Sequence, residues 1–98
     1  MIQLEDEDGY EVAFIEETLL LHPLIPSLDD DNYELLGYVD PYGVTIFNWM
    51  QASVLTKDLA RAKAKAHSQE TVVLLDTIIA LADKAMAEGN LYLKFSGD

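Results

Sequence analysis

Apolar and polar residues alternate in two short stretches near the start of the chain. Ile2 and Leu4 alternate with polar neighbours, and after an acidic run Tyr10, Val12 and Phe14 repeat the pattern. A period of two residues is typical of a strand with one buried face, and the acidic run ends in glycine, which suits a hairpin loop. The pattern therefore predicts a β-hairpin.

Residues 16–32 break this regularity. The stretch contains Pro23, Pro26 and three consecutive aspartates, but its leucines make it too apolar for a free linker. We expect a connector that crosses the surface, with a helical turn at residues 17–21.

The most specific local signal is the sequence Asp40-Pro41-Tyr42-Gly43. It matches a type I turn, because Asp at the first position bonds back to the turn amides, Pro presets φ at the second and Gly suits the fourth. We therefore predict a second hairpin from residues 35–40 and 44–47, with Tyr42 exposed in its turn.

Two helices are predicted in the second half of the chain. The first covers residues 49–66, where Asn48 and Gln51 have the spacing of a capping box, and the second covers residues 69–88, between Ser68 as N-cap and Gly89 as C-terminal stop. The first helix has one apolar stripe, made of Leu55, Leu59, Ala62 and Ala66. The second has two adjacent stripes, one of Val72, Leu75, Ile79, Ala82 and Met86 and one of Leu74, Ile78, Leu81 and Ala85. Such a wide apolar face indicates either a central position between the sheet and a partner helix or burial in a homodimer.

A final strand is predicted where Leu91, Leu93 and Phe95 alternate with polar neighbours. Together these elements predict an α+β fold: a small antiparallel sheet of four to five strands with two helices packed on one face, in a single domain of residues 1–98. The pattern leaves open where the last strand pairs in this sheet.

Composition changes the picture mainly through charge. The net charge is −12, and residues 1–56 hold twelve Asp and Glu and no Lys or Arg, whereas residues 57–98 hold six acidic and six basic residues. This field repels nucleic acids and anionic membranes and attracts a basic protein, although an acidic surface also serves solubility alone. The start of the chain is unlike a signal peptide, no apolar run is long enough for a membrane, and there is no cysteine for a disulfide. We expect a cytoplasmic protein.

The acidic runs invite a metal-site interpretation that their spacing does not support. A calcium loop aligned on Gly9 would place Leu4 and Ile15 where Asp and Glu ligands are required, and residues 29–31 lack the glycine turn and the closing Glu. Solvated loops are the preferred interpretation, and a weak divalent-cation site is the alternative. His22 and His67 lack the spacing of a zinc motif, and no nucleophile motif or phosphate loop occurs. We predict no catalytic residue, metal ligand or cofactor.

A basic stripe, Lys57, Arg61 and Lys65, follows one face of the first helix. Its cations are too few to offset the net charge. The stripe therefore does not predict a nucleic-acid partner. The stripe is interpreted as an exposed helix face, with a contact to the acidic half or an external anionic partner as alternatives.

Aromatic residues near the central turn complete a candidate partner surface. Trp and Tyr are frequent in interface hot spots, although they are also ordinary core residues of a small domain. With the neighbouring acids, the candidate surface consists of Asp29, Asp30, Asp31, Tyr33, Asp40, Tyr42 and Trp49.

Two segments of the chain resemble a known family. Residues 40–48 read DPYGVTIFN and residues 91–98 read LYLKFSGD. They are similar to a D-P-Y-G-x-T-x-F-N segment and a C-terminal Y-L-x-F-x-G-D in a family of small, uncharacterised acidic bacterial proteins. The chain departs from this pattern at Val44, where the family usually has an acidic residue, and at Ser96, where it usually has an aliphatic one. The resemblance implies a bacterial source and no particular activity.

The leading hypothesis is a non-enzymatic protein-binding module, of inhibitor or immunity type, whose acidic surface docks on a basic protein. One alternative is a small-ligand binder or a carboxylate-based enzyme near residues 40–48. The other is a housekeeping homodimer formed through the helix at residues 69–88.

Overall fold

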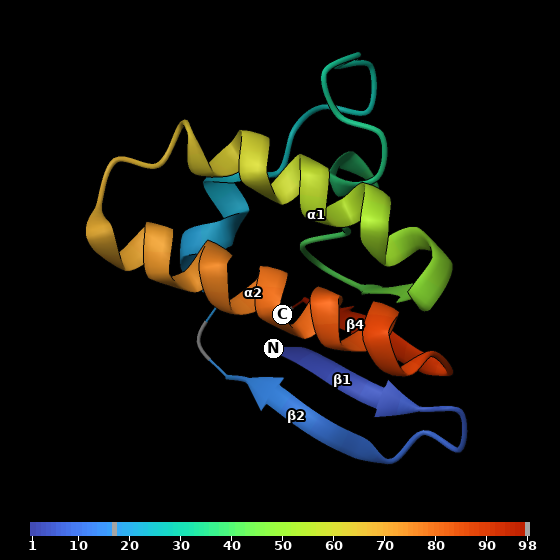
Figure 1. The fold of residues 1–98 in the computed structure, drawn as a ribbon. Coiled ribbons are helices and arrows are strands. Elements are labelled where there is room, and N and C mark those ends of the chain that lie inside the picture. The colour runs from blue at the N-terminus through green and yellow to red at the C-terminus, as the bar shows by residue number, and fades with distance from the viewer. Residues whose placement is uncertain (17, 98) are drawn as a thin grey trace.

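The computed structural model describes residues 1–16 and 18–97. Two helices cover one face of a four-stranded antiparallel sheet (Figure 1), which confirms the predicted α+β class. In chain order the elements are β1 (Ile2–Asp6), β2 (Glu11–Ile15), the 3₁₀ helices η1 (Leu19–Leu24) and η2 (Leu36–Tyr38), β3 (Val44–Asn48), α1 (Trp49–Lys63), α2 (Gln69–Glu88) and β4 (Leu91–Ser96).

The last strand lies inside the sheet. The strand order is β2-β1-β4-β3, and β4 pairs antiparallel with both β1 and β3. At the end of β4, the Ser96 N–H donates to the Met1 carbonyl at 2.8 Å and the Gly97 N–H donates to the Gly43 carbonyl at 2.6 Å. The strand therefore joins the start of the chain to its central segment.

Both predicted helices form, with the caps that the sequence indicates. The Asn48 side chain accepts from the Gln51 N–H and the Gln51 side chain accepts from the Asn48 N–H, each at 2.9 Å. Ser68 Oγ accepts from the Thr71 N–H at 3.2 Å. The first helix ends at Lys63, earlier than predicted, because the amides of the next residues bond three residues back, as in a 3₁₀ turn. In the described part of the chain, no helix combines the length and the apolarity needed to cross a membrane.

The wide apolar face of α2 is covered by the chain itself except at Met86, which is exposed. This helix packs against α1, β4, β1 and η1, and both of its predicted stripes contribute buried residues, among them Leu75 and Ile78. The central position that the sequence offered as one interpretation therefore accounts for the width of the face. That width gives no support to a homodimer through α2.

The connector folds locally. Glu17, the first residue of the predicted helical turn at 17–21, lies outside the described residues, and the 3₁₀ helix η1 occupies Leu19–Leu24. Leu21 of η1 is buried, and η1 packs against α2. The leucines of this segment thus contribute to the core.

The first hairpin forms, but the alternation that predicted its second strand lies on the exposed face. Ala13 and Ile15 pack against the core, whereas Val12 and Phe14 are 44% and 54% exposed. Strand β2 reads Glu-Val-Ala-Phe-Ile and is apolar on both faces. Its pairing with the buried Ile2 directs Ile15 inward, and Phe14 therefore points outward.

The second predicted hairpin is wrong, although its turn is real. The Gly43 N–H bonds to the Asp40 carbonyl at 3.3 Å and the Tyr42 N–H to the Asp40 carboxylate at 2.9 Å, and Tyr42 is 84% exposed, as predicted. Residues 35–40 are not a strand, because η2 lies there and β3 pairs with β4 instead.

A buried carboxylate explains the helical turn at η2. Asp58 of α1 is 2% exposed, and its oxygens accept from the backbone N–H groups of residues 34, 35 and 36 at 2.7–3.2 Å. Three successive amides can converge on one acceptor only in a turn, since amides alternate in direction along a strand. Asp58 thus fixes the segment before β3 in a helical turn.

We expect Asp58→Ala to lower the free energy of unfolding by about 2–4 kcal/mol, because it leaves three inward-facing amides without their acceptor. Urea denaturation measures the change. Asp76→Ala, which removes an exposed carboxylate paired with Lys63, is the control and should cost less than about 1 kcal/mol. Equal costs would show that Asp58 does not hold η2.

The α2 helix allows a second stability test. Leu75 is fully buried and Val73 is 54% exposed. Leu75→Ala should therefore cost about 2–5 kcal/mol and Val73→Ala less than about 1 kcal/mol in the same denaturation experiment. A larger loss for Val73→Ala would contradict the orientation of the helix.

Candidate binding surface

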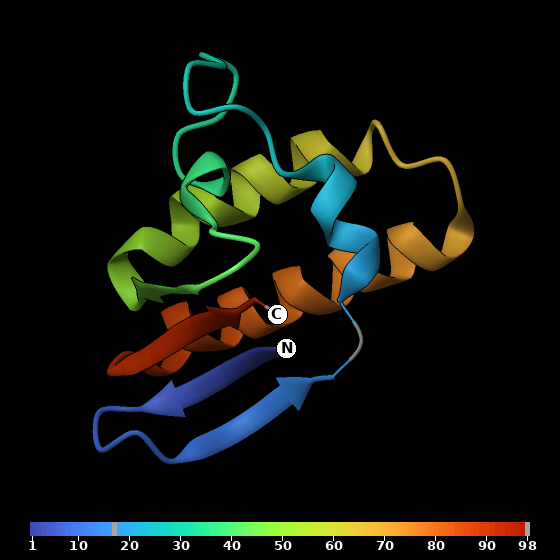
Figure 2. The ribbon, with the colours of Figure 1, turned by 180° about the vertical axis from the view of Figure 1, so that it is seen from behind.

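The predicted partner surface is divided among three regions (Figures 1 and 2). The loop before η2 holds Asp29, Asp30, Asp31 and Tyr33, the turn before β3 holds Asp40 and Tyr42, and Trp49 begins α1. The turn and Trp49 lie at opposite ends of β3, a strand of five residues, and therefore about 17 Å apart. The seven residues do not form one continuous patch.

The aspartate loop is ordered by its own side chains. The Asp30 carboxylate accepts from the backbone N–H of Asn32 at 3.0 Å, and the Ser27 hydroxyl donates to Asp29. The hydrogen bond from Ser27 holds the pKa of the Asp29 carboxyl below its usual value. Asp29 therefore loses its proton at a lower pH than an aspartate without such a hydrogen bond.

A polar cavity of about 160 Å³ lies beside this loop. Asp31 and Glu34 line one part of it, and Lys57 and Arg61 from the basic stripe of α1 line another. Both cations are exposed, and the third residue of the stripe, Lys65, lies over the Tyr33 ring at 5.3 Å. The stripe is thus an exposed helix face next to the aspartate loop, as the preferred interpretation predicted.

Trp49 belongs to a different surface, the sheet face that the helices leave uncovered. Its ring contacts Tyr92 edge to face, with 5.5 Å between the centroids. We call this side of the sheet the open face; Figure 2 looks onto it. Its residues are Gln3, Glu5, Val12, Phe14, Val44, Ile46, Tyr92 and Lys94.

The open face is polar in the middle and apolar at both edges. One row across the sheet runs from Phe14 through Gln3 and Lys94 to Ile46. Glu5, which lies in the next row opposite Tyr92, forms an ion pair with Lys94, with 3.7 Å between the charged atoms. The outer positions Phe14 and Ile46 are each more than half exposed. Exposed aromatic and branched residues that gather on one face mark a contact surface more often than scattered ones do.

Sequence reasoning missed Val12, Phe14, Val44 and Ile46 as surface residues. The alternation that revealed the strands was taken as the sign of one buried face. The available signal was the run of consecutive apolar residues in β2, Val12 to Ile15. Such a run places apolar side chains on both faces of the strand, so the face that does not meet the core exposes its apolar residues unless a partner covers them.

Carboxylates surround one end of the open face. Asp6 ends β1, Glu7 and Asp8 follow in the β1–β2 loop, and Glu11 begins β2. We call these four residues the hairpin acids. The Asp6 carboxylate accepts from the N–H groups of Asp8 and Tyr10, each at 2.9 Å, so the loop has a defined shape. The other end of β2 is followed by Glu16.

The basic residues do not neutralise the acidic half. Among the described residues, the ion pairs are Lys63–Asp76, Lys84–Glu88 and Lys94–Glu5. Of the described acids in residues 1–56, Glu5 alone is therefore paired with a cation. The charge asymmetry of the sequence persists as an uncompensated negative surface in the folded chain.

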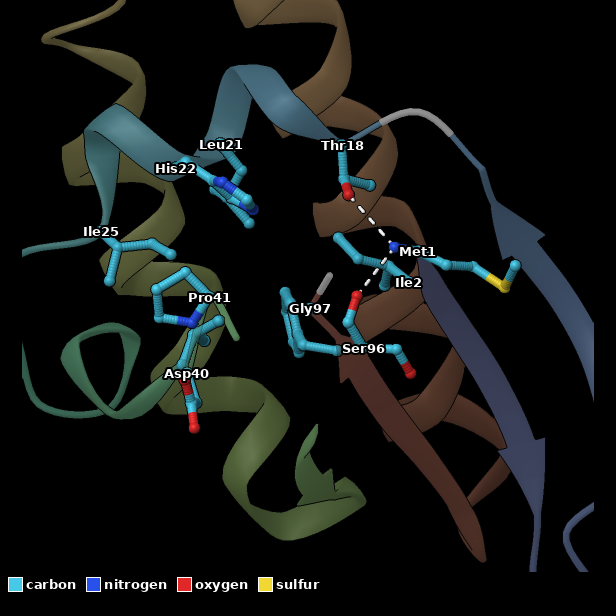
Figure 3. Close-up of a pocket in the computed structure, with 12 residues that line it drawn as sticks. Met1, Ile2, Thr18, Leu21, His22, Ile25, Asp40, Pro41, Ser96 and Gly97 are labelled. Carbon is cyan, nitrogen blue, oxygen red and sulfur yellow. Dashed lines mark hydrogen bonds between the residues drawn. The ribbon is translucent and has the colours of Figure 1, made fainter. Parts of the chain in front are cut away.

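The two segments that carry the family resemblance pack against each other (Figure 3). Pro41 of the turn and Gly97 after β4 lie side by side, next to the hydrogen bonds that the Met1 amino group donates to Thr18 Oγ1 and the Ser96 carbonyl. A side chain at Gly97 would overlap the Pro41 carbonyl, and one at Gly43 would come within 2.6 Å of the Asp40 carboxylate. Asp98, the last residue of the terminal motif, lies outside the described residues.

This junction has little room for a ligand. The cavity between the turn, the chain start and η1 measures about 20 Å³, which accommodates roughly one water molecule. The buried carboxylate of Asp58 accepts hydrogen bonds from three backbone amides. Within the described residues, no three His, Asp or Glu side chains cluster as metal ligands would. The geometry thus gives no support to a small-ligand site or a carboxylate enzyme at residues 40–48.

Comparison of the chain with protein-family models, with characterised proteins and with solved structures found no match. The surface must therefore be interpreted from its own geometry and charge.

The junction of the two motif segments predicts the effect of substitutions at its glycines. Gly97→Val should lower the melting temperature, because the new side chain would have to displace the Pro41 carbonyl from beside β4. Gly43→Val should also destabilise the fold, by about 1–2 kcal/mol, through contact with the Asp40 carboxylate. Thermal denaturation measures both. Gly9→Asn is the control. A Cβ at position 9 would meet no atom within 4 Å, and Asn tolerates the φ of +85° better than other residues with a side chain do, so this change should cost less than either valine substitution.

Proposed function

We propose that this protein is a non-enzymatic protein-binding module, of inhibitor or immunity type, that docks on a basic protein. The single observation that supports the proposal most strongly is the uncompensated acidic half. Eleven of its carboxylates are described, and a cation within the chain neutralises only Glu5. Folding leaves this charge at the surface, where a basic partner can approach it.

The open face is the part of the surface best suited to hold the partner. Exposed apolar side chains give a partner area to bury, and charged groups beside them attract and select it. The open face supplies exposed apolar residues at both edges, and the hairpin acids and Trp49 lie at one of its ends. The aspartate loop has charge and one exposed large apolar residue, Leu28. We assign this loop, together with Asp40, the role of attracting the partner over a distance.

Three triple variants separate these contributions, and each removes three negative charges. The first neutralises hairpin acids (Glu7→Gln, Asp8→Asn, Glu11→Gln). The second neutralises the loop (Asp29→Asn, Asp30→Asn, Asp31→Asn), and the third neutralises exposed acids of α2 as the control (Glu70→Gln, Asp83→Asn, Glu88→Gln). The immobilised proteins are incubated with a lysate of the native host at about 0.05 M and about 0.3 M NaCl, between which the Debye length falls by more than half.

We expect the wild type to capture a basic protein in a salt-dependent manner. The hairpin variant should lose most of the capture, the loop variant should bind the same protein more slowly, and the α2 variant should match the wild type. Capture of a neutral or acidic protein, or equal capture by all four chains, would contradict the proposal.

A further inference from the structure

The edge of the sheet at β2 has the properties of a site for an added strand. Among the described strands, β2 has one neighbour, β1, and it lies at the side of the sheet away from α1 and β3 (Figures 1 and 2). An unpaired edge presents backbone donors and acceptors to any extended chain that approaches it. Many folded proteins block such an edge with Lys or Pro, and β2 contains neither.

The hydrogen-bond pattern shows which backbone groups face this edge. The Ser96 N–H bonds to the Met1 carbonyl, so the backbone groups of Met1 are directed to β4. Because these groups alternate in direction along a strand, those of Gln3 also face β4, and those of Ile2 and Leu4 face β2. Ile2 is paired with Ile15 and Leu4 with Ala13. The N–H and C=O of Phe14, between these two partners, therefore point away from β1 to the free edge.

The side chains at this edge are suited to a partner as well. Phe14 and Val12 stand on the open face directly beside the edge, more than 40% exposed. A strand added here would place every second side chain against them. The register shift opposite Glu5 disturbs the Glu11 end of β2, so the regular part of the edge is centred on Phe14.

Charge identifies the occupant. Glu11 and Glu16 flank the apolar part of β2, and Asp6, Glu7 and Asp8 are close to its start. Antiparallel pairing of two copies of β2 would bring these acidic ends together, in chains that each have a net charge of −12. An extended segment with basic residues at both ends and alternating apolar residues between them matches the edge in hydrogen bonding, shape and charge.

We propose that β2 accepts such a basic, extended segment of the partner by strand addition, with the partner's apolar side chains on Val12 and Phe14. This inference rests on the proposed function and specifies how the basic protein is held. Backbone pairing at Phe14 provides affinity, and the flanking carboxylates provide charge selection.

The test uses the full-length chain labelled with ¹⁵N and two synthetic peptides with blocked termini. Each peptide has two lysines at either end and alternating valine and threonine between them; in the second, alternate backbone nitrogens are methylated. The two peptides have the same charge and side chains, but the methylated one cannot donate along one edge. Nuclear magnetic resonance gives the binding site, the affinity and the exchange rate of each amide hydrogen.

We expect the unmodified peptide to shift the resonances of residues 11–16 and to slow exchange of the Phe14 amide by at least about tenfold. The methylated peptide should bind at least about tenfold more weakly, since its methylated nitrogens cannot donate to the backbone carbonyls of β2. Phe14→Pro, which removes the outward N–H at an edge position that tolerates proline, should abolish the peptide-induced resonance shifts of the remaining residues of 11–16, whereas Phe14→Ala should only weaken binding.

Several results would overturn the strand addition. Equal affinities of the two peptides, or resonance shifts confined to residues 29–31, would be compatible with a basic partner. Either result would contradict its backbone pairing with β2. Protection of the Phe14 amide in the free protein at high concentration would assign the edge to a second copy. Failure of the peptide to bind, while the host protein is still captured through the hairpin acids, would reject this edge and retain the proposed function; failure of both would reject both.

Discussion

The fold depends on the insertion of the last strand between the first and the third. Leu91, Leu93 and Phe95 on the inner side of β4 are buried against the helices, and Phe95 contacts Phe47 of β3 edge to face at 5.7 Å. The same strand binds β1 along its whole length. Because contacts of this kind join residues far apart in the chain, the core forms only when both ends of the sequence are in place. With β4 and β3 on one side of β1, β2 is left at the opposite edge of the sheet.

This topology determines which surfaces are available to a partner. The helices cover one face of the sheet, so its other face and the β2 edge stay accessible. The acidic residues of the first half follow the same division: the hairpin acids lie at the end of the open face, and the aspartate loop lies beside α1. The six basic residues come from α1, α2, β4 and the segment between the helices. In the described residues three of them form ion pairs, two with acids of the second half and one with Glu5. Charge asymmetry along the chain thus becomes charge asymmetry on the surface.

Features determined by a few neighbouring residues could be predicted from the sequence. The capping box at Asn48, the cap at Ser68 and the turn at Asp40 all form as predicted, because each is a local hydrogen-bond pattern. The partner of β3 could not be predicted, because it depends on a strand more than 40 residues away. The orientation of β2 could not be predicted either, since apolar residues occupy both of its faces. Asp58 was overlooked, although it lies between the buried Leu55 and Ala62 on the same face of α1. For the same reason the candidate surface was predicted only in part: its charges were evident from composition, whereas its apolar side required the pairing of the strands.

The central claim is that the folded chain leaves its acidic half uncompensated and therefore open to a basic partner. The dependence of the melting temperature on salt near pH 7 tests it most directly, because salt screens interactions among exposed charges. If repulsion among the unpaired carboxylates dominates, the melting temperature will be higher at about 0.5 M than at about 0.02 M NaCl. A melting temperature that falls on addition of salt would show that attraction to Lys57, Arg61 and the other cations already neutralises the acidic half within the molecule.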